Sequence, residues 1–405
     1  MNIVVIGAQW GDEGKGKVVD YLASQADVVV RFSGGANAGH RITIDKKQYD
    51  FHLLPSGLLN SQTLVILGTA MVIDLEALFQ EIDLFENQKV SISNRILISD
   101  RAHIVLPRYL ELDRIHDMNR PFPLGTTGKG IGVAYSLKAQ RIGIRIADLF
   151  SDQFFSKLAQ KEQEYLKPYL FRLKNMSIDL PHYMEQIQGK KIIFEGAQGV
   201  MLDLDLGSYP YVTSSNTALA GALIGGNVPA HAINHVLGVF KAYSTRVGNG
   251  PFPSEFSAKQ KDLEEKIRTI GHEFGVTTGR ERRCGYLDLL ALKYACWNTG
   301  IQSLAITHLD VYDSFNEIGV CVSYEHEGKV IDWVPASSDV LEKLTPVIKK
   351  FPGWKTNTGV ITRWEELPRR AREYLNFIEK YVGIPLSIIS VGAEREQIIY
   401  KQEVW

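Results

Sequence analysis

A glycine-rich run at residues 11–17 carries the residue types that hold the phosphates of a nucleotide. It reads Gly-Asp-Glu-Gly-Lys-Gly-Lys and fits the first seven positions of the pattern G-x-x-x-x-G-K. Glycines let backbone N–H groups approach a phosphate closely, and Lys15 and Lys17 add positive charge. A bare turn has no need of two lysines, so the run predicts a site for a nucleoside triphosphate.

The eighth position departs from that pattern. Val18 stands where a Ser or Thr hydroxyl normally binds Mg²⁺. Another oxygen must then hold the metal: Asp12 is a hard oxygen donor inside the run, and the backbone of the loop at Gly39 could supply a second oxygen. A carboxylate among phosphates would repel them unless a cation bridged the two or the carboxylate served as a base. We therefore expect Asp12 to have a chemical role.

Polar residues also follow several other short apolar runs. The sequences concerned are Ser-Gly-Gly-Ala-Asn-Ala-Gly-His after residue 31, Glu-Gly-Ala-Gln-Gly after residue 194, His-Leu-Asp after residue 307 and Val-Gly-Ala-Glu-Arg after residue 390. In open α/β sheets, ligands lie beyond the carboxyl ends of the strands. We expect these segments to surround one site.

The runs that must position these segments are rich in β-branched residues and alternate with longer, helix-compatible sequence. They lie at residues 3–6, 28–31, 64–67, 96–99, 191–194, 236–240, 304–307 and 386–390. This rhythm predicts an α/β fold with a large, mostly parallel sheet surrounded by helices, like that of the phosphate-loop NTPases. The helix after the glycine-rich run is expected at residues 18–23. We expect one domain over residues 1–405, with a helical insertion around residues 151–190.

Composition argues against several classes of partner. The 405 residues have a formal net charge of −1, which gives no electrostatic reason to bind nucleic acid or an anionic membrane.

Residues 1–7 lack the features of a secretion signal, and no apolar stretch is long enough for a membrane span, so we expect a cytoplasmic protein. Cys284, Cys296 and Cys321 are too few and too widely spaced for a zinc cluster, and we expect them to be reduced and mostly packed.

The chain resembles the adenylosuccinate synthetase family over nearly its whole length. The matching motifs begin at Gln9 (Gln-Trp-Gly-Asp-Glu-Gly-Lys-Gly-Lys), Gly35 (Gly-Ala-Asn-Ala-Gly-His), Asp100 (Asp-Arg-Ala-His), Gly125 (Gly-Thr-Thr-Gly-Lys-Gly-Ile-Gly), Glu195 (Glu-Gly-Ala-Gln-Gly), Tyr209 (Tyr-Pro-Tyr-Val-Thr-Ser-Ser), Lys241 (Lys-Ala-Tyr-Ser-Thr-Arg-Val-Gly) and Thr277 (Thr-Thr-Gly-Arg-Glu-Arg-Arg). The resemblance implies a ligase of AMP biosynthesis that first transfers the γ-phosphate of GTP to O6 of IMP. The amino group of L-aspartate then displaces that phosphate, giving adenylosuccinate, GDP and phosphate.

The resemblance also implies residue roles. Asp12 matches the family's base and Mg²⁺ ligand, His40 its acid, and Lys15 and Gln198 complete the catalytic set, with Gly39 as second metal ligand. The residues implied for IMP are Asp12, Glu13, Gly14, Lys15, Asn37, Ala38, Gly39, His40, Thr127, Gln198, Thr213, Arg280 and, from the partner subunit of a homodimer, the arginine at the position of Arg141.

Two further sets belong to the other substrates. The implied aspartate loop comprises Val276, Thr277, Thr278, Gly279, Arg280, Glu281 and Arg282. The implied GTP residues are Asp12, Glu13, Gly14, Lys15, Gly16, Lys17, Val18, Gly39, His40, Arg41, Arg282, His308, Leu309, Asp310, Ser390, Val391 and Gly392. A carboxylate at Asp310 can accept from guanine N1–H and the 2-amino group together, and adenine offers neither donor there.

Three positions depart from the family's usual residues. Arg41 replaces a threonine, His308 replaces a lysine whose stem normally covers the base, and Val133 replaces a proline. A histidine ring can also stack on a base, so the consequence concerns GTP preference rather than the chemistry.

Two other functions fit parts of the sequence. A phage-type relative makes 2-aminoadenylosuccinate from a guanine nucleotide, but such relatives carry a smaller residue in place of Asp12. A GTP-binding switch protein would need neither the pair of Asp12 and His40 nor the arginine-rich loop.

Overall fold

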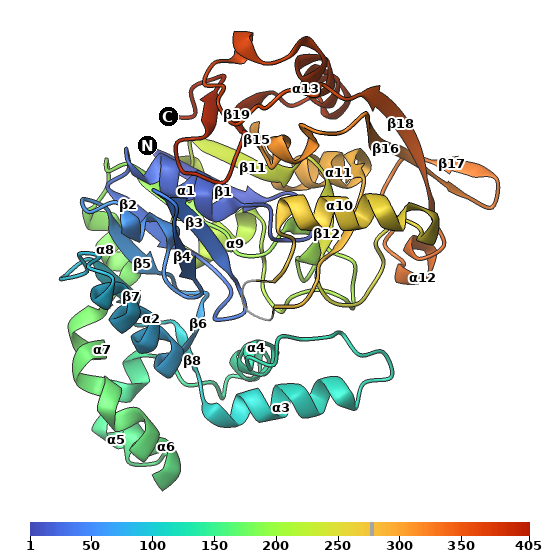
Figure 1. Cartoon of the computed structure of the whole chain (residues 1–405). Helices are drawn as coiled ribbons and strands as arrows, with labels where there is room; N and C mark the ends of the chain where they lie inside the picture. The colour runs from blue at the N-terminus through green and yellow to red at the C-terminus, as the bar shows by residue number, and fades with distance from the viewer. Residues whose placement is uncertain (276–278) are drawn as a thin grey trace.

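The computed structural model describes residues 1–275 and 279–405, and its main feature is one large sheet (Figure 1). Among these residues, ten strands pair in the order β20-β19-β15-β11-β1-β10-β2-β5-β7-β9, all parallel except β20. Their bounds are Ile398–Tyr400, Leu386–Ser390, Ser303–Thr307, His235–Lys241, Asn2–Gly7, Ile192–Glu195, Val28–Arg31, Leu64–Leu67, Ile96–Ser99 and Ser177–Ile178 in that order. The fold class predicted from the sequence is confirmed.

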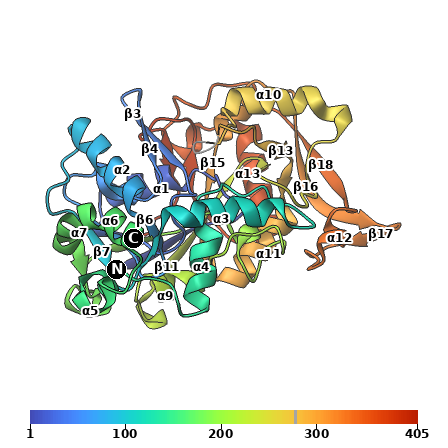
Figure 2. The same cartoon turned by 90° about the horizontal axis from the view of Figure 1, so that it is seen from below.

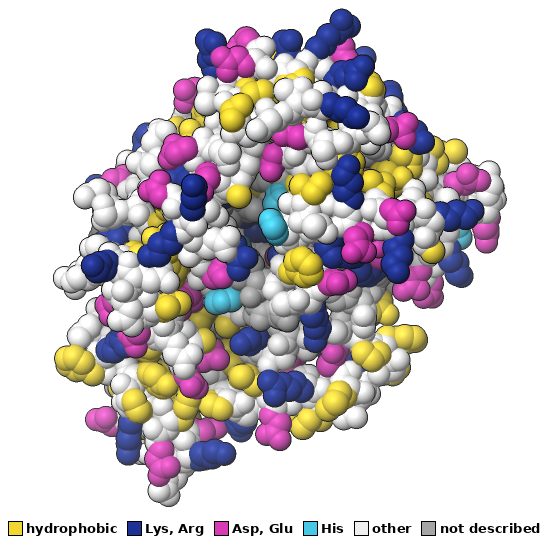
Figure 3. All heavy atoms as spheres, viewed as in Figure 1, with side chains coloured by type: hydrophobic (Ala, Val, Ile, Leu, Met, Phe, Trp, Pro, Cys, Tyr) yellow, Lys and Arg dark blue, Asp and Glu magenta, His cyan; other side chains and the backbone are white. Residues whose placement is uncertain are grey.

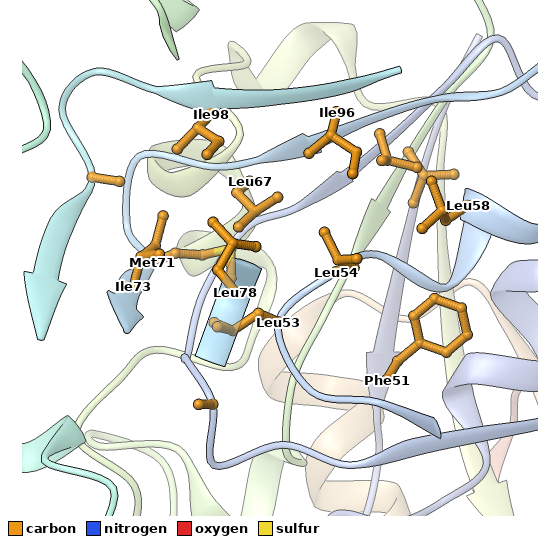
Figure 4. Close-up of a cluster of buried hydrophobic side chains, with 14 of the residues drawn as sticks. Phe51, Leu53, Leu54, Leu58, Leu67, Met71, Ile73, Leu78, Ile96 and Ile98 are labelled. Atoms are coloured by element: carbon orange, nitrogen blue, oxygen red, sulfur yellow. The ribbon is translucent and has the colours of Figure 1, made fainter. Parts of the chain in front are cut away.

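Strand β1 lies inside this sheet and is covered on both faces. Its side chains alternate, with Ile3 and Val5 in one buried apolar cluster and Val4 and Ile6 in the other. Figure 4 shows part of the first cluster, with Leu67 and Leu78 among its labelled side chains. Each fully buried side chain of this size contributes roughly 1.5–3 kcal/mol, so the segment that leads into the glycine-rich run is firmly held.

Helices cover both faces of the sheet (Figures 1 and 2). The longer ones are α1 (Lys15–Ala23), α2 (Leu75–Asn87), α3 (Pro107–Met118), α4 (Ile131–Ala139), α9 (Leu219–Gly225), α10 (Lys261–Gly271), α11 (Leu289–Thr299) and α13 (Arg369–Val382). Helix α1 was expected from residue 18 but begins at Lys15, because Gly14 takes the left-handed conformation (φ 81°) that starts the turn early.

The segment at residues 151–190 contains the expected helices. They are α5 (Asp152–Phe155), α6 (Gln160–Leu166), α7 (Leu170–Met176) and α8 (Leu180–Gln186). Strand β9 lies between α7 and α8 and pairs with β7, which the sequence analysis did not foresee. This segment therefore also supplies an edge of the sheet.

Smaller strands fix the loops around the carboxyl edge. The hairpin of β3 (His40–Ile44) and β4 (Lys47–Phe51) follows β2, while β6 (Val72–Asp74) pairs with β8 (His103–Val105), and β12 (Ser244–Arg246) with β13 (Arg283–Gly285). Away from them, β14 (Leu287–Asp288), β16 (Glu317–His326), β17 (Lys329–Ile331) and β18 (Thr345–Pro352) form a separate sheet beside α12 (Ser338–Leu341). In the described part of the chain, no helix combines the length and apolar character needed to cross a membrane.

Candidate active site

A cavity of about 240 Å³ lies beyond the carboxyl ends of β1, β2 and β10. Its lining includes the following residues that the sequence analysis assigned to catalysis or IMP: Asp12, Lys15, Asn37, Ala38, Gly39, His40, Thr127, Gln198 and Thr213. They come from five segments that are far apart in the sequence. Figure 3 shows a face of the molecule that is hollowed near its middle, with histidine side chains beside the hollow.

Glu13 stabilises the glycine-rich run through hydrogen bonds to residues of the same segment. Its buried carboxylate accepts from the backbone N–H of Gln9 at 3.1 Å and of Gly11 at 2.9 Å, and from Lys15 Nζ at 2.5 Å. Asp12 has φ 57°, a left-handed conformation that aspartate tolerates better than most residues. Glu13 thus shapes the run and balances the charge of Lys15.

Asp12 is joined to the arginine-rich loop. Its Oδ2 accepts from Arg282 Nε at 2.7 Å, and Arg282 Nη1 donates to Glu273 Oε2 at 2.7 Å. Burial would lower the pKa of Arg282, but the charges of Asp12 and Glu273 raise it above its usual value, so the guanidinium stays charged. If Asp12 acts as a base or as a metal ligand, Arg282 must either share this carboxylate with the proton or metal or move away from it.

Beneath Arg282 lies a buried polar cluster. Glu273 Oε1 accepts from Lys241 Nζ at 2.8 Å and from the hydroxyl of Tyr243 at 2.5 Å. Burial would raise the pKa of Glu273, but Lys241, His308 and Arg282 bring it down to about 2. This permanent anion fixes the position of Arg282.

His40, the first residue of β3, is oriented by a buried carboxylate. Its Nδ1 lies 2.8 Å from Glu195 Oε1 and 3.2 Å from Ser56 Oγ. Glu195 also accepts from the backbone N–H and the hydroxyl of Ser56, at 2.8 and 2.6 Å. Burial would raise the pKa of Glu195, but the hydrogen bonds from His40 and Ser56 hold it below its usual value. An ionised Glu195 accepts only, so Nδ1 carries a proton and Nε2 is left for a ligand.

Gln198 lines the cavity with an unused polar atom. Its Oε1 is buried and has no hydrogen-bond partner among the described residues. A buried amide oxygen without a partner costs about 1–3 kcal/mol, which a ligand in the cavity would recover. This observation supports a ligand contact at Gln198.

The segments expected to bind the base lie side by side, because β15 and β19 are neighbours in the sheet. His308, Leu309 and Asp310 follow β15, and burial raises the pKa of the Asp310 carboxyl. Ser390 ends β19 and leads into Val391 and Gly392. Among the predicted nucleotide residues, the side chains of Val18, Leu309 and Val391 are buried in the core, so their backbones alone can face a ligand.

His308 is fixed by Tyr243. The hydroxyl of Tyr243 lies 3.3 Å from Nδ1 of His308, and the two rings meet edge to face with centroids 5.9 Å apart. Since Tyr243 gives its one hydroxyl proton to Glu273, it accepts from Nδ1–H of His308. Burial lowers the pKa of His308 to about 4, so the ring is neutral at pH 7.

Both the sequence and the fold match known proteins. The sequence profile of adenylosuccinate synthetase matches residues 4–399. An adenylosuccinate synthetase of Schizosaccharomyces japonicus is 44% identical over 419 residues, 98% of this chain and 96% of that protein. One of Clostridium novyi is 44% identical over 426 residues and 99% of each chain. The fully ligated adenylosuccinate synthetase of Plasmodium falciparum has a TM-score of 0.92 and 36% identity, with 99% of each chain covered.

The chain belongs to the adenylosuccinate synthetase family. The family predicted from the motifs is confirmed, and with it a ligase that forms a carbon–nitrogen bond in purine biosynthesis. The succinoaminodeoxyadenylate synthetase of cyanophage S-2L, solved with dGMP and dATP, matches with a TM-score of 0.67 and 17% identity over 99% of this chain and 95% of that one. That likeness shows a shared fold alone.

The positions at which this member departs from the family's usual residues lie in different surroundings. Arg41 pairs with Asp50 across the β3–β4 hairpin, at 2.6 and 2.8 Å, on the exposed side. Val133 is buried in the first turn of α4, where a change of side chain alters local packing. Of the three, His308 is the one that lies beside Asp310, the residue predicted to recognise the base.

Several predicted residues do not line the cavity. Arg141 is exposed just beyond α4, with φ 66°. Arg280 Nη1 donates to the carbonyl of Gly125 at 3.4 Å at the cavity's edge, while exposed Glu281 lies 3.7 Å from Arg268. Gly279 donates to the carbonyl of Gly275 at 2.7 Å. Val276, Thr277 and Thr278 lie outside the described residues.

Sequence reasoning missed the residues that hold these groups in place, chiefly Ser56, Glu195, Tyr243 and Glu273. Glu195 stands at the end of an apolar strand, the same signal that drew attention to Gln198. Glu273, which is fully buried, had no such signal.

Proposed function

We propose that this chain joins L-aspartate to IMP at the expense of GTP, through 6-phosphoryl-IMP, and releases adenylosuccinate, GDP and phosphate. The observation that carries this proposal is the convergence of Asp12, His40 and Gln198 on one cavity, with Arg282 joining the arginine-rich loop to Asp12. The family's solved relative described as fully ligated supports an arrangement in which every substrate is held at once.

In the first step, Asp12 takes the N1 proton of IMP, and O6 attacks the γ-phosphorus of GTP as the bond to the bridging oxygen breaks and GDP leaves. Removing that proton makes O6 a competent nucleophile. In the second step, the amino nitrogen of aspartate bonds to C6 while the C6–O6 bond breaks, and the departing phosphate takes the proton that the nitrogen loses. His40, oriented through Nδ1 by Glu195, presents Nε2 to the transferring oxygens and offers them a hydrogen bond.

Mg²⁺ would be held by the carboxylate of Asp12 and the carbonyl of Gly39, both at the cavity. No group of three or more His, Cys, Asp or Glu side chains suited to a metal occurs among the described residues. A single carboxylate fits this metal, because Mg²⁺ in nucleotide enzymes is held by one or two carboxylates and by substrate phosphates. When bound, it would offset negative charge on the phosphate oxygens.

The remaining contacts are assigned by chemistry. Asn37, Thr127 and Thr213 offer short polar groups to IMP, while Arg280 and Arg282 suit the carboxylates of aspartate. Asp310 would accept from the guanine edge of GTP. We place the partner copy's equivalent of Arg141 at the phosphate of IMP, which makes the active form a homodimer. The three cysteines are free and buried, which fits the reducing cytoplasm.

A direct assay tests the proposal. Purified protein with Mg²⁺, IMP and aspartate, offered GTP and then ATP, should show the ultraviolet change of a 6-substituted purine and should prefer GTP. The same protein offered dGMP in place of IMP tests the phage-type alternative. Absence of product with either nucleotide would contradict ligase activity, and binding of GTP without product would favour the switch-protein function.

A further inference from the structure

The ammonium group of Lys17 is fully engaged away from the phosphate side of the glycine-rich run. Its Nζ donates to Ser390 Oγ at 2.8 Å, to the carbonyl of Gly392 at 2.7 Å and to the carbonyl of Gln397 at 3.0 Å. A lysine ammonium has three N–H donors, so all three are used. A phosphate could gain Lys17 only by displacing one of these acceptors.

Asp20 holds the same loop from the next turn of α1. Residues three apart lie on one face of a helix, so Lys17 and Asp20 face the same way. The Asp20 carboxylate pairs with Arg395 through two hydrogen bonds, both of 2.6 Å, and is fully buried. A buried pair with this fork geometry is costly to break from one side, so it is a firm attachment.

The segment held in this way, residues 390–397, begins with Ser390, Val391 and Gly392, which the family resemblance assigns to GTP. It is further closed by Gln397, whose Oε1 accepts from the backbone N–H of Glu394 at 3.0 Å and whose backbone carbonyl accepts from Val391 N–H at 3.0 Å. Asp310 follows β15, the neighbour of β19 in the sheet, so it lies on the same side of the site as this loop. One helix face therefore fixes the loop that must complete the pocket around Asp310.

We propose that Lys17 and Asp20 are positioning residues for base recognition: they anchor the 390–397 loop against α1, and Lys17 acts on the choice of base rather than on the phosphates. This inference rests on the proposed function, in which GTP is a substrate, and on the predicted contact of Ser390, Val391 and Gly392 with its base. The phosphate charge would then be met by backbone N–H groups of the run and by Lys15.

Selectivity distinguishes the two roles of Lys17. A residue that binds phosphate contacts a group that every nucleoside triphosphate shares. Its loss would therefore weaken the binding of GTP, ITP and ATP by the same factor. A residue that anchors the 390–397 loop shapes the pocket around the base. Its loss would therefore weaken the binding of GTP most and that of ATP least.

The test compares dissociation constants for GTP, ITP and ATP, measured by displacement of a fluorescent GTP analogue. In Lys17→Met, which keeps the aliphatic stem, the preference for GTP over ATP should fall at least about fivefold. Arg395→Lys keeps the positive charge but loses the paired hydrogen bonds to Asp20. It should shift the preference in the same direction, and because Arg395 has no predicted phosphate contact, that shift could come only from the loop. Lys15→Met is the matched comparison and should weaken all three nucleotides alike.

An equal loss of affinity for GTP, ITP and ATP in Lys17→Met would overturn the proposal, as would an unchanged preference in Arg395→Lys. If Lys17→Met does not fold, the Arg395→Lys result decides. The wild-type assay separates this inference from the proposed function. If the wild type has no ligase activity, the proposed function is wrong. If the wild type is active but the variants keep its preference for GTP over ATP, only the role of Lys17 and Asp20 as anchors is wrong.

Discussion

At the scale of single residues, the catalytic candidates were visible in the sequence but their supports were not. Asp12, His40 and Gln198 stand in glycine-rich motifs at strand ends, where polar side chains indicate a site. Glu195 and Ser56 come from segments 139 residues apart and meet only because the sheet and the helices bring them together. Sequence spacing carries no signal for such a contact.

Glu195→Gln tests the support of His40. The amide keeps the size of the carboxylate but removes the charged acceptor that orients the His40 ring, so kcat should fall on the order of 10–100-fold. Steady-state assays should show a much smaller change in the KM for GTP. Ser56→Ala, which leaves the direct bond between Glu195 and His40, is the control and should lose far less. Equal kcat in wild type and Glu195→Gln would refute a role for Glu195 in catalysis.

His308 predicts a dependence of stability on pH. Burial lowers its pKa to about 4 in the folded chain, against 6.5 for the ordinary group; Glu273 opposes this shift, while Lys241, Arg282 and Lys17 reinforce it. The unfolded chain therefore binds a proton first, and stability falls as pH drops from about 6.5 towards 4, by an amount on the order of 3 kcal/mol. Urea unfolding at pH 7 and 5 should show a smaller loss in His308→Asn than in the wild type. An identical loss in both proteins would argue against a neutral His308.

At the scale of elements, the sequence located the eight longer strands of the sheet to within about one residue, since each is a β-branched run with a clear end. It missed β9 and β20, which have two and three residues and little pattern to read. It also placed the start of α1 three residues late, because a glycine and two lysines resemble loop sequence until the cap at Gly14 is seen.

The start of α1 packs tightly against the start of β3. A Cβ added at Gly16 would lie 2.8 Å from Cβ of His40 and 3.1 Å from Ser56 Oγ. Gly16→Ala should therefore displace His40, costing roughly 1–3 kcal/mol of stability and lowering kcat. Thermal unfolding and steady-state kinetics measure the two effects. A variant with wild-type stability and kcat would show that this contact relaxes without consequence.

At the scale of the whole molecule, the site depends on contacts between distant parts of the chain. Arg282 lies 270 residues from Asp12, and the cluster of Lys241, Tyr243 and Glu273 beneath it is wholly buried. Sequence reasoning placed the arginine-rich loop near the substrates through family resemblance, but no pattern in one sequence shows which carboxylate an arginine will meet.

The homodimer proposal predicts complementation between inactive variants. Arg141→Ala removes the residue that a subunit would lend to its partner, and Asp12→Ala removes one that a subunit uses itself, so each variant alone should be inactive. After mixing and subunit exchange, mixed dimers would hold one intact site, and activity should approach about a quarter of the wild-type value for equal, random pairing. No recovery in mixtures shown to exchange subunits would contradict the shared site.

The central claim is that Asp12, in the run that binds the triphosphate, also starts the chemistry on IMP. Asp12→Asn keeps the side chain's size but removes its basicity, and GDP release in the presence of IMP and aspartate measures the result. We expect turnover to fall at least about 100-fold while calorimetry still detects IMP and GTP bound. Turnover within about tenfold of the wild-type rate, in a folded variant, would contradict the claim.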